Sequence, residues 1–194
     1  MELQEALEIV SYKTALKKGE EALADKVLLP ETIQQAILDQ AEGNARSISA
    51  KDYILATKLV REHRSLLYKK ENEDFLADNA TKASIQTTPS GLQFHVLTQG
   101  QGEKPTPDGQ VTVHYRGTLI DGTEFDSSHQ RGKESTFSLS KVIKGWCEGV
   151  LLMNPGSTFC FYIPHELAYG ERGLDPKIPP YSTLIIEVEL LSIP

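Results

Sequence analysis

Glycine and proline divide the chain into two parts, and this division constrains the fold more than any other feature of the sequence. The first 84 residues hold 2 Gly and 1 Pro, whereas the remaining 110 hold 12 Gly and 9 Pro. Because both residues interrupt regular elements and mark turns, we expect an all-helical first part and a turn-rich second part. The stretch 85–90, Ile-Gln-Thr-Thr-Pro-Ser, is the expected joint.

Three helices are expected in the first part. The spacing of apolar residues predicts the first helix over about 2–24. Pro30, at a favourable first position, opens a second helix that ends at Gly43, a natural C-cap. Ser49, followed three residues later by Asp52, predicts the start of a third helix that nothing interrupts before about residue 84.

The third helix changes character along its length. Its first half carries an apolar stripe, which consists of Tyr53, Ala56, Val60, His63 and Leu67. Its second half has few large apolar residues, which predicts a spacer arm that runs through solvent. Because the first part offers little other apolar surface, we expect the stripe to pack against a second copy in a two-fold homodimer. An intrachain three-helix bundle is the alternative.

The second part shows the alternation that is typical of strands. Strands are expected at 92–96, 111–115, 118–120, 123–125, 159–163 and 184–190, with further alternation at Phe137 and Leu139. Asp121-Gly122 is a two-residue hairpin signal, and a short helix is expected over about 144–153. The fold class is therefore α+β: a helical part with a long connecting helix, then a curved antiparallel sheet wrapped on one short helix. The expected domains are a helical dimerisation domain (1–48), the connecting helix (49–84) and the sheet domain (85–194).

Composition excludes several kinds of protein. The net charge of −7 is spread over both parts, which argues against the basic surface of a nucleic-acid-binding protein. No apolar run approaches the roughly 20 residues of a membrane span, and the first residues lack the features of a signal peptide. Cys147 and Cys160 fall in separate elements, which favours free thiols. We therefore expect a cytoplasmic protein, or a periplasmic one if a signal peptide has been removed.

Neither metal nor cofactor chemistry is expected. The five histidines show no metal-ligand spacing and fall on separate elements, and no glycine-rich phosphate loop is present. Cys147 follows Trp146 near a helix start, but nothing in the sequence identifies a base for a thiolate nucleophile. An inert thiol is the favoured interpretation.

Six ordered motifs in the second part carry a family resemblance. They are Val-Thr-Val-His-Tyr-Arg-Gly (111–117), Gly-Thr-Glu-Phe-Asp-Ser-Ser (122–128), Val-Ile-Lys-Gly-Trp (142–146), Leu-Ala-Tyr-Gly (167–170), Ile-Pro-Pro (178–180) and Thr-Leu-Ile-Ile-Glu-Val-Glu-Leu-Leu (183–191). Over about residues 88–193 the chain resembles the FK506-binding-protein (FKBP) class of peptidyl-prolyl cis-trans isomerases. The resemblance implies an enzyme that accelerates isomerisation of X-Pro bonds during protein folding.

The first part points to a subfamily. Ser11-Tyr12, Gly19, the long third helix and the joint at 90–94 resemble the bacterial macrophage-infectivity-potentiator and FKBP22-type proteins. These are V-shaped homodimers joined through their N-terminal helices, and they bind clients as chaperones do. The resemblance implies proline-containing unfolded or partly folded proteins as partners, and FK506- or rapamycin-like macrolides as inhibitors.

The resemblance also assigns site residues. The implied catalytic residues are Tyr115, Phe125, Asp126, Trp146 and Tyr169. The implied substrate- and inhibitor-binding residues are Arg131, Phe137, Val142, Ile143, Ile178 and Ile186. The proline ring would lie over Trp146, Tyr169 would donate to a substrate carbonyl, and Asp126 would belong to a polar group with Tyr115 and Arg131. On its own residue chemistry Trp146 would be a core residue, and Asp126 would be a turn residue.

Two positions depart from the family pattern. Ser135 falls near a place where an aromatic residue is common, and Ile186 stands where Phe usually closes the pocket wall. Both changes loosen the rim, so we expect weaker macrolide binding and an altered preference at the residue before proline. The rival to the enzyme is a binding module that grips apolar segments with little turnover.

Overall fold

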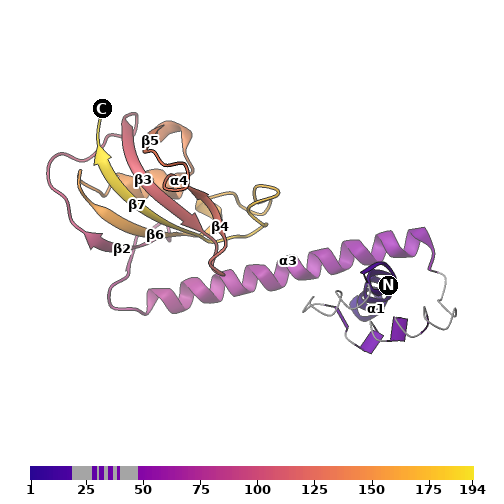
Figure 1. Ribbon diagram of the computed structural model, residues 1–194. Helices are drawn as coiled ribbons and strands as arrows, with labels where there is room; N and C mark the ends of the chain where they lie inside the picture. The colour runs from indigo at the N-terminus through magenta and orange to yellow at the C-terminus, as the bar shows by residue number, and fades with distance from the viewer. Residues whose placement is uncertain (19–27, 30, 33–34, 37–38, 40–47) are drawn as a thin grey trace. The chain divides into compact units, whose positions relative to one another are not determined.

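The computed structural model resolves the chain into two compact units, residues 1–67 and 68–194. It describes residues 1–18, 28–29, 31–32, 35–36, 39 and 48–194 (Figure 1). The division between the units falls inside one long helix, α3 (Ala50–Ala80). The sequence placed the start of the second domain at residue 85, so the observed boundary lies well before the predicted one.

The first unit contains helix α1 (Leu3–Lys18) and the first half of α3. The predicted continuation of the first helix to residue 24 and most of the predicted second helix lie outside the described residues. Ser49 caps α3 as expected, because its Oγ accepts the Asp52 N–H at 3.0 Å and donates to the Asp52 carboxylate at 2.6 Å. The helix ends at Ala80, four residues before the predicted end.

Part of the apolar stripe of α3 is buried within one chain. Ala56 and Val60 belong to a cluster that also includes Val10 and Tyr12 of α1. Leu66 of the same half-helix stays 61% exposed. Among the described helices, none combines the length and apolarity that a membrane span needs.

The second unit is built on one antiparallel sheet. Its strands are β1 (Gln86–Thr87), β2 (Gln93–Thr98), β3 (Gln110–Thr118), β4 (Glu124–Ser127), β5 (Ser135–Ser138), β6 (Thr158–Ile163) and β7 (Leu184–Ser192). Their order is β1-β2-β6-β7-β3-β4, and β5 also pairs with β3 (Figure 1). The α+β class is confirmed. The strand predicted at 111–115 extends to Thr118 in β3, whereas the other two residues of the strand predicted at 118–120 fall in the turn that follows. Leu139 lies in a short 3-10 turn, η2 (Leu139–Lys141).

Apolar residues at every second position of the central strands form the core. On β7, Leu184, Ile186, Val188 and Leu190 are all buried, and they lie on one face because successive side chains of a strand point to opposite faces. β7 pairs with β3 on one side, where Tyr115 lies opposite Val188, and with β6 on the other, where Phe161 lies opposite Ile186. The sheet therefore brings Tyr115 and Ile186, which are far apart in the chain, to one region.

The turn at Asp121-Gly122 is present, but it holds three residues and not two. Leu119 N–H donates to the Thr123 carbonyl at 2.9 Å, and Gly122 N–H donates back to the Leu119 carbonyl at 3.0 Å. Gly122 has a φ of 85°, which glycine tolerates and other residues rarely adopt. This is the three-residue loop with glycine in the left-handed position, one of the common hairpin solutions.

Helix α4 (Lys144–Val150) packs closely against β6. A side chain at Gly149 would meet the Phe161 ring at 2.6 Å, and one at Gly145 would meet Ile163. Because these two positions are four apart, they form one glycine face on the helix. The close approach places Trp146, next to Gly145, in the core of the sheet domain. The helix ends at Val150, earlier than the predicted Met153, and a turn follows it.

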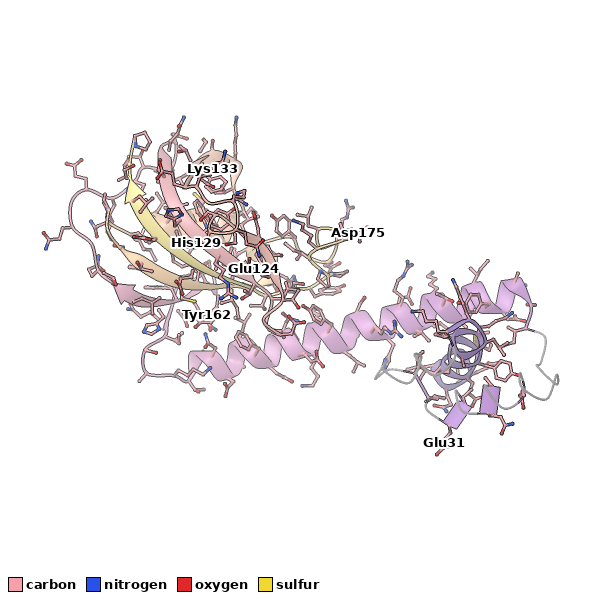
Figure 2. The ribbon with its side chains drawn as sticks, viewed as in Figure 1. Glu31, Glu124, His129, Lys133, Tyr162 and Asp175 are labelled. Carbon is pink, nitrogen blue, oxygen red and sulfur yellow. The ribbon has the colours of Figure 1, made fainter. Side chains whose placement is uncertain are left out.

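The second half of α3 is part of the second unit and not a spacer in solvent. Asn72 and Asn79 are 1% and 2% exposed, and Phe75 packs against Tyr162 of β6 with ring centroids 6.1 Å apart. Tyr162 lies on the α3 side of the sheet (Figure 2). The spacer interpretation failed in part because two of the buried residues are asparagines, which look like surface in a sequence but have their side-chain oxygen and nitrogen hydrogen-bonded here.

Candidate functional site

A pocket of about 420 Å³ opens where α4 meets the sheet of the second unit. Its lining consists of Tyr115, Phe125, Asp126, Phe137, Lys141, Val142, Ile143, Trp146, Tyr169, Leu184 and Ile186. Most of these side chains are apolar or aromatic, with a few polar groups at one side. This composition is typical of a small-molecule or peptide site.

Aromatic rings in edge contact form one side of the pocket. The Phe137 ring lies 5.4 Å from Trp146 and 5.6 Å from Tyr115, centroid to centroid, with interplanar angles of 73° and 65°. Edge-to-face packing suits the charge distribution of aromatic rings. Trp146 is only 4% exposed. The core therefore holds the indole, and only a small part of it lines the pocket.

Phe125 reaches the pocket because its neighbour on β3 is a glycine. Gly117 lies opposite Asp126 in the β3–β4 ladder, and a side chain at Gly117 would overlap the Phe125 ring. Any larger residue at Gly117 would push that ring away. The motif that ends in Gly117 was noted in the sequence, but this role of its glycine was not predicted.

Three polar side chains at the pocket edge are locked together. The Tyr115 hydroxyl donates to Asp126 Oδ2 at 2.6 Å, and Arg131 donates to Asp126 Oδ1 and, at 2.7 Å, to the Tyr115 hydroxyl. The Ser127 N–H adds a fourth bond, to Asp126 Oδ1 at 2.9 Å. The structure thus assembles the predicted group of Tyr115, Asp126 and Arg131.

This arrangement fixes the charge state of each member. Burial acts against the charged carboxylate of Asp126, but the hydrogen bond from Tyr115 and the bonds and charge of Arg131 outweigh it, so the pKa of Asp126 is lowered. Burial, together with the bond to Asp126, raises the pKa of Tyr115. At neutral pH the aspartate is therefore ionised and the tyrosine carries its proton.

Tyr169 stands at the open side of the pocket. It is 36% exposed, and burial followed by the nearby charge of Asp126 raises the pKa of its hydroxyl. It follows the short 3-10 turn η3 (His165–Leu167), at the start of the loop that leads to β7. That loop also carries Asp175 (Figure 2). A protonated hydroxyl at this place can donate to a ligand carbonyl.

Two of the predicted site residues do not line the pocket. Arg131 acts on it only through Tyr115 and Asp126, and it also donates to Ser135 Oγ at 3.1 Å. Ile178 is 3% exposed and forms an isolated bridge with Leu174, so it supports the wall from within the core. Ile186 does line the pocket, at 5% exposure.

The sequence also left out residues that the structure brings to the site. Lys141 and Leu184 line the pocket. Leu184 could have been found, because it begins the β7 alternation that contains Ile186. Ser128 is fully buried and its Oγ accepts the Tyr115 N–H at 2.9 Å, which pins the loop after β4 to β3.

Whether the chain could support another chemistry depends on its cysteines and its possible metal ligands. Burial, and then the neighbouring Glu148, raise the pKa of the Cys147 thiol, which disfavours a thiolate. Both cysteines are free. Within the described part of the chain, no group of three or more His, Cys, Asp or Glu side chains is arranged to hold a metal ion.

Comparisons with known proteins agree with this geometry. A family model described as FKBP-type peptidyl-prolyl cis-trans isomerase matches residues 101–191, and a model of the domain amino-terminal to such isomerases matches residues 4–96. The FKBP-type 22 kDa peptidyl-prolyl cis-trans isomerase of Escherichia coli is 41% identical over 192 residues, which cover 94% of this chain and 93% of that protein.

Two further relatives extend the comparison. The isomerase Mip of Coxiella burnetii is 48% identical over 119 residues, 61% of this chain and 52% of that protein. The crystal structure of FkpA from Escherichia coli matches with a TM-score of 0.69 at 32% identity, covering 93% of this chain and 88% of that one. The chain therefore belongs to the FKBP-type peptidyl-prolyl cis-trans isomerases and carries the amino-terminal domain found in part of that family.

Proposed function

We propose that X-Pro isomerisation takes place in the 420 Å³ pocket, with the substrate proline ring lying on the Trp146 indole. The observation that carries this proposal is the pairing of a largely buried aromatic surface with polar groups of fixed charge at its edge. Trp146 and Tyr115 are 4% and 8% exposed, and Asp126 is held ionised beside them.

The reaction requires no covalent step. Rotation about the X-Pro bond loses amide resonance, which creates a barrier of roughly 18–20 kcal/mol. An enzyme lowers this barrier by binding the twisted amide more tightly than either planar form. Because the twisted amide has lost its resonance dipole, an aromatic pocket that excludes water suits it better than bulk water does.

The polar groups then hold the substrate in place. The Tyr169 hydroxyl donates to a substrate carbonyl, since its raised pKa keeps it protonated. The Asp126 carboxylate faces the twisting amide, fixed by Tyr115 and Arg131. Ile143, the residue that precedes α4, lies at the pocket wall, where its backbone N–H would take a second ligand carbonyl.

The first unit is proposed to form a homodimer and to support client binding as a chaperone does. Leu55 and Leu66 of α3 are 43% and 61% exposed. Because they are eleven residues apart, three helical turns place them on nearly the same face. A second copy of this chain would cover that face. Two linked pockets would then raise the effective concentration of the second contact on an unfolded client.

FK506- and rapamycin-like macrolides are proposed to bind in the same pocket, weakened by Ile186 in place of a larger aromatic side chain. Trp146 is the only tryptophan of the chain, so its fluorescence reports directly on the pocket. Titration with FK506 should change the Trp146 emission at the same midpoint as it inhibits peptide isomerisation. The variant Ile186→Phe should lower that midpoint. Inhibition without any change in emission would place the macrolide elsewhere and overturn the assignment of the pocket.

A further inference from the structure

Three residues of α3 contact one short segment of the sheet domain, residues 181–183. The Thr183 N–H donates to Asn72 Oδ1 at 2.7 Å. The Lys69 ammonium lies 5.3 Å from the centroid of the Tyr181 ring, and the Tyr68 hydroxyl lies 3.4 Å from Ser182 Oγ. Positions 68, 69 and 72 are neighbours on the helix surface, so one patch of α3 holds three consecutive residues.

Asn72 makes the strongest of these contacts. It is 1% exposed, and its Nδ2 donates to the Tyr68 carbonyl at 2.8 Å, which orients Oδ1 toward Thr183. Thr183 is also 1% exposed, so removal of Asn72 would leave its N–H without this acceptor at a buried position. Leaving a buried N–H without a partner is more costly than a hydrogen bond is worth on average.

The 181–183 segment lies between two parts of the pocket wall. Leu184 follows it directly, and Ile186 is two residues further along β7; both line the pocket. On the other side, the Tyr181 N–H donates to the Gly170 carbonyl at 3.0 Å, immediately after Tyr169. The Tyr181 ring also packs edge-on against His165, with centroids 5.3 Å apart. Movement of the segment would therefore shift Tyr169 and the β7 wall together.

We propose that Asn72, with Lys69 and Tyr68, positions the isomerase pocket from outside it, by fixing the 181–183 segment. The inference rests on the assignment of the pocket as the active site. In this arrangement the end of α3 is a functional part of the isomerase domain. These residues touch no substrate and act through Tyr181 and Thr183.

The chain provides a matched control on the same helix. Asn79 is as deeply buried as Asn72, at 2% exposure. Its Nδ2 donates to Gln93 Oε1 at 2.9 Å, and Gln93 Nε2 donates to the Leu76 carbonyl at 2.8 Å. Gln93 lies on β2 and does not line the pocket. Loss of Asn79 should therefore weaken the packing of α3 without moving the pocket wall.

The test compares Asn72→Ala with Asn79→Ala in the full chain, at a temperature where both are fully folded. Because Asn72 fixes the wall through a hydrogen bond, we expect kcat/KM on an X-Pro peptide to fall on the order of fivefold in Asn72→Ala. Asn79→Ala should stay within twofold of wild type despite a comparable loss of stability. Equal activities of the two variants, whether both reduced or both unchanged, would overturn the proposal.

A second pair of variants serves if Asn72→Ala does not fold. Tyr181→Ala removes the ring contacts with Lys69 and His165 and should lower kcat/KM, whereas Tyr181→Phe keeps the ring and should restore it. A loss of activity in both variants, or in neither, would contradict positioning by this ring. Trp146→Leu is measured in parallel, because retained activity there would remove the pocket assignment itself, independently of the α3 variants.

Discussion

The two compact units differ in where their exposed large apolar side chains lie. In the first unit, exposed apolar residues gather on one half-helix, where Ile54, Leu55, Leu66 and Leu67 are 42–69% exposed. In the second unit most large apolar side chains close into one core around the sheet. Leu97 and Leu174 are exposed singly, at 48% and 47%, and further apolar surface lines the pocket. A surface that remains apolar after folding marks an interaction site. The exposed side chains of the first unit therefore support the proposed homodimer, in which a second copy covers them, whereas the second unit carries a pocket of its own.

The helix that runs through both units sharpens this difference. The half of α3 that looks apolar in the sequence leaves leucines exposed, and the half that looks polar is docked through buried asparagines. Side-chain polarity therefore did not predict the burial of Asn72 and Asn79, because a buried amide is tolerated where its polar atoms are hydrogen-bonded.

The largest expected effect is on assembly. Leu55→Glu combined with Leu66→Glu places two charges on the exposed face, so we expect loss of the dimer, seen as a halved mass in light scattering. Peptide isomerisation per chain should stay within twofold, whereas catalysed refolding of a proline-limited protein should fall because the two pockets are no longer linked.

Arg61→Glu is the control for this pair, since residue 61 is exposed and lies about a third of a turn around the helix from the face of Leu55 and Leu66. It should leave the dimer intact. If the wild-type chain is already monomeric, the exposed apolar face of the first unit is not a dimer interface, and the contrast drawn between the two units is wrong.

Replacement of the indole gives the next largest effect, on catalysis. Trp146 is both pocket floor and core, so Trp146→Leu is preferable to alanine because it keeps most of the apolar volume. Loss of an apolar platform worth roughly 1.5–3 kcal/mol predicts a fall in kcat/KM of about 10- to 100-fold. The measurement is a protease-coupled X-Pro peptide assay.

Phe159→Leu is the matched substitution outside the pocket. Phe159 is 2% exposed and stacks on Phe94, so its loss should destabilise the same core and leave kcat/KM within twofold. If both variants lose activity in proportion to stability, Trp146 is a core residue only.

Much of the fold and part of the pocket were predictable because they depend on local sequence. The Ser49–Asp52 cap, the turn at Asp121-Gly122 and the alternation from Leu184 each depend on near neighbours. The ordered motifs then placed Tyr115, Asp126 and Trp146 in one pocket. The contacts of Asn72 with Thr183 and of Asn79 with Gln93 were not predictable, since the partners lie 111 and 14 residues away along the chain and asparagine carries no periodic signal. Ile178 was expected in the pocket wall but lies in the core behind it, because family motifs say which residues gather near a site but not which of them line the pocket.

A smaller effect is expected from the Tyr169 hydroxyl. Tyr169→Phe removes one hydrogen bond to the substrate, worth about 0.5–1.5 kcal/mol, so kcat/KM should fall about three- to tenfold. The control is Tyr162→Phe, because Tyr162 is a half-buried tyrosine on the α3 side of the sheet. This variant should show unchanged kcat/KM in the same assay. An unchanged Tyr169→Phe variant would show that the substrate carbonyl takes its donor from elsewhere.

The smallest effect is expected from pH, because the groups at the pocket are held away from titration. The pKa of Asp126 is lowered and those of Tyr115 and Tyr169 are raised, so kcat/KM should be flat between about pH 6 and 9, given ordinary values near 4 and 10.

A group whose pKa is lower in the folded state stabilises the fold at pH values above its unfolded pKa, and this contribution is lost as the pH falls through the folded pKa. The stability advantage of wild type over Asp126→Asn should therefore be constant at neutral pH and shrink below about pH 4. Urea unfolding at a series of pH values measures it. An advantage that grows on acidification would mean that Asp126 is not the ionised partner of Arg131, and the pocket edge would then lack the fixed charge that distinguishes it from the apolar surface of the first unit.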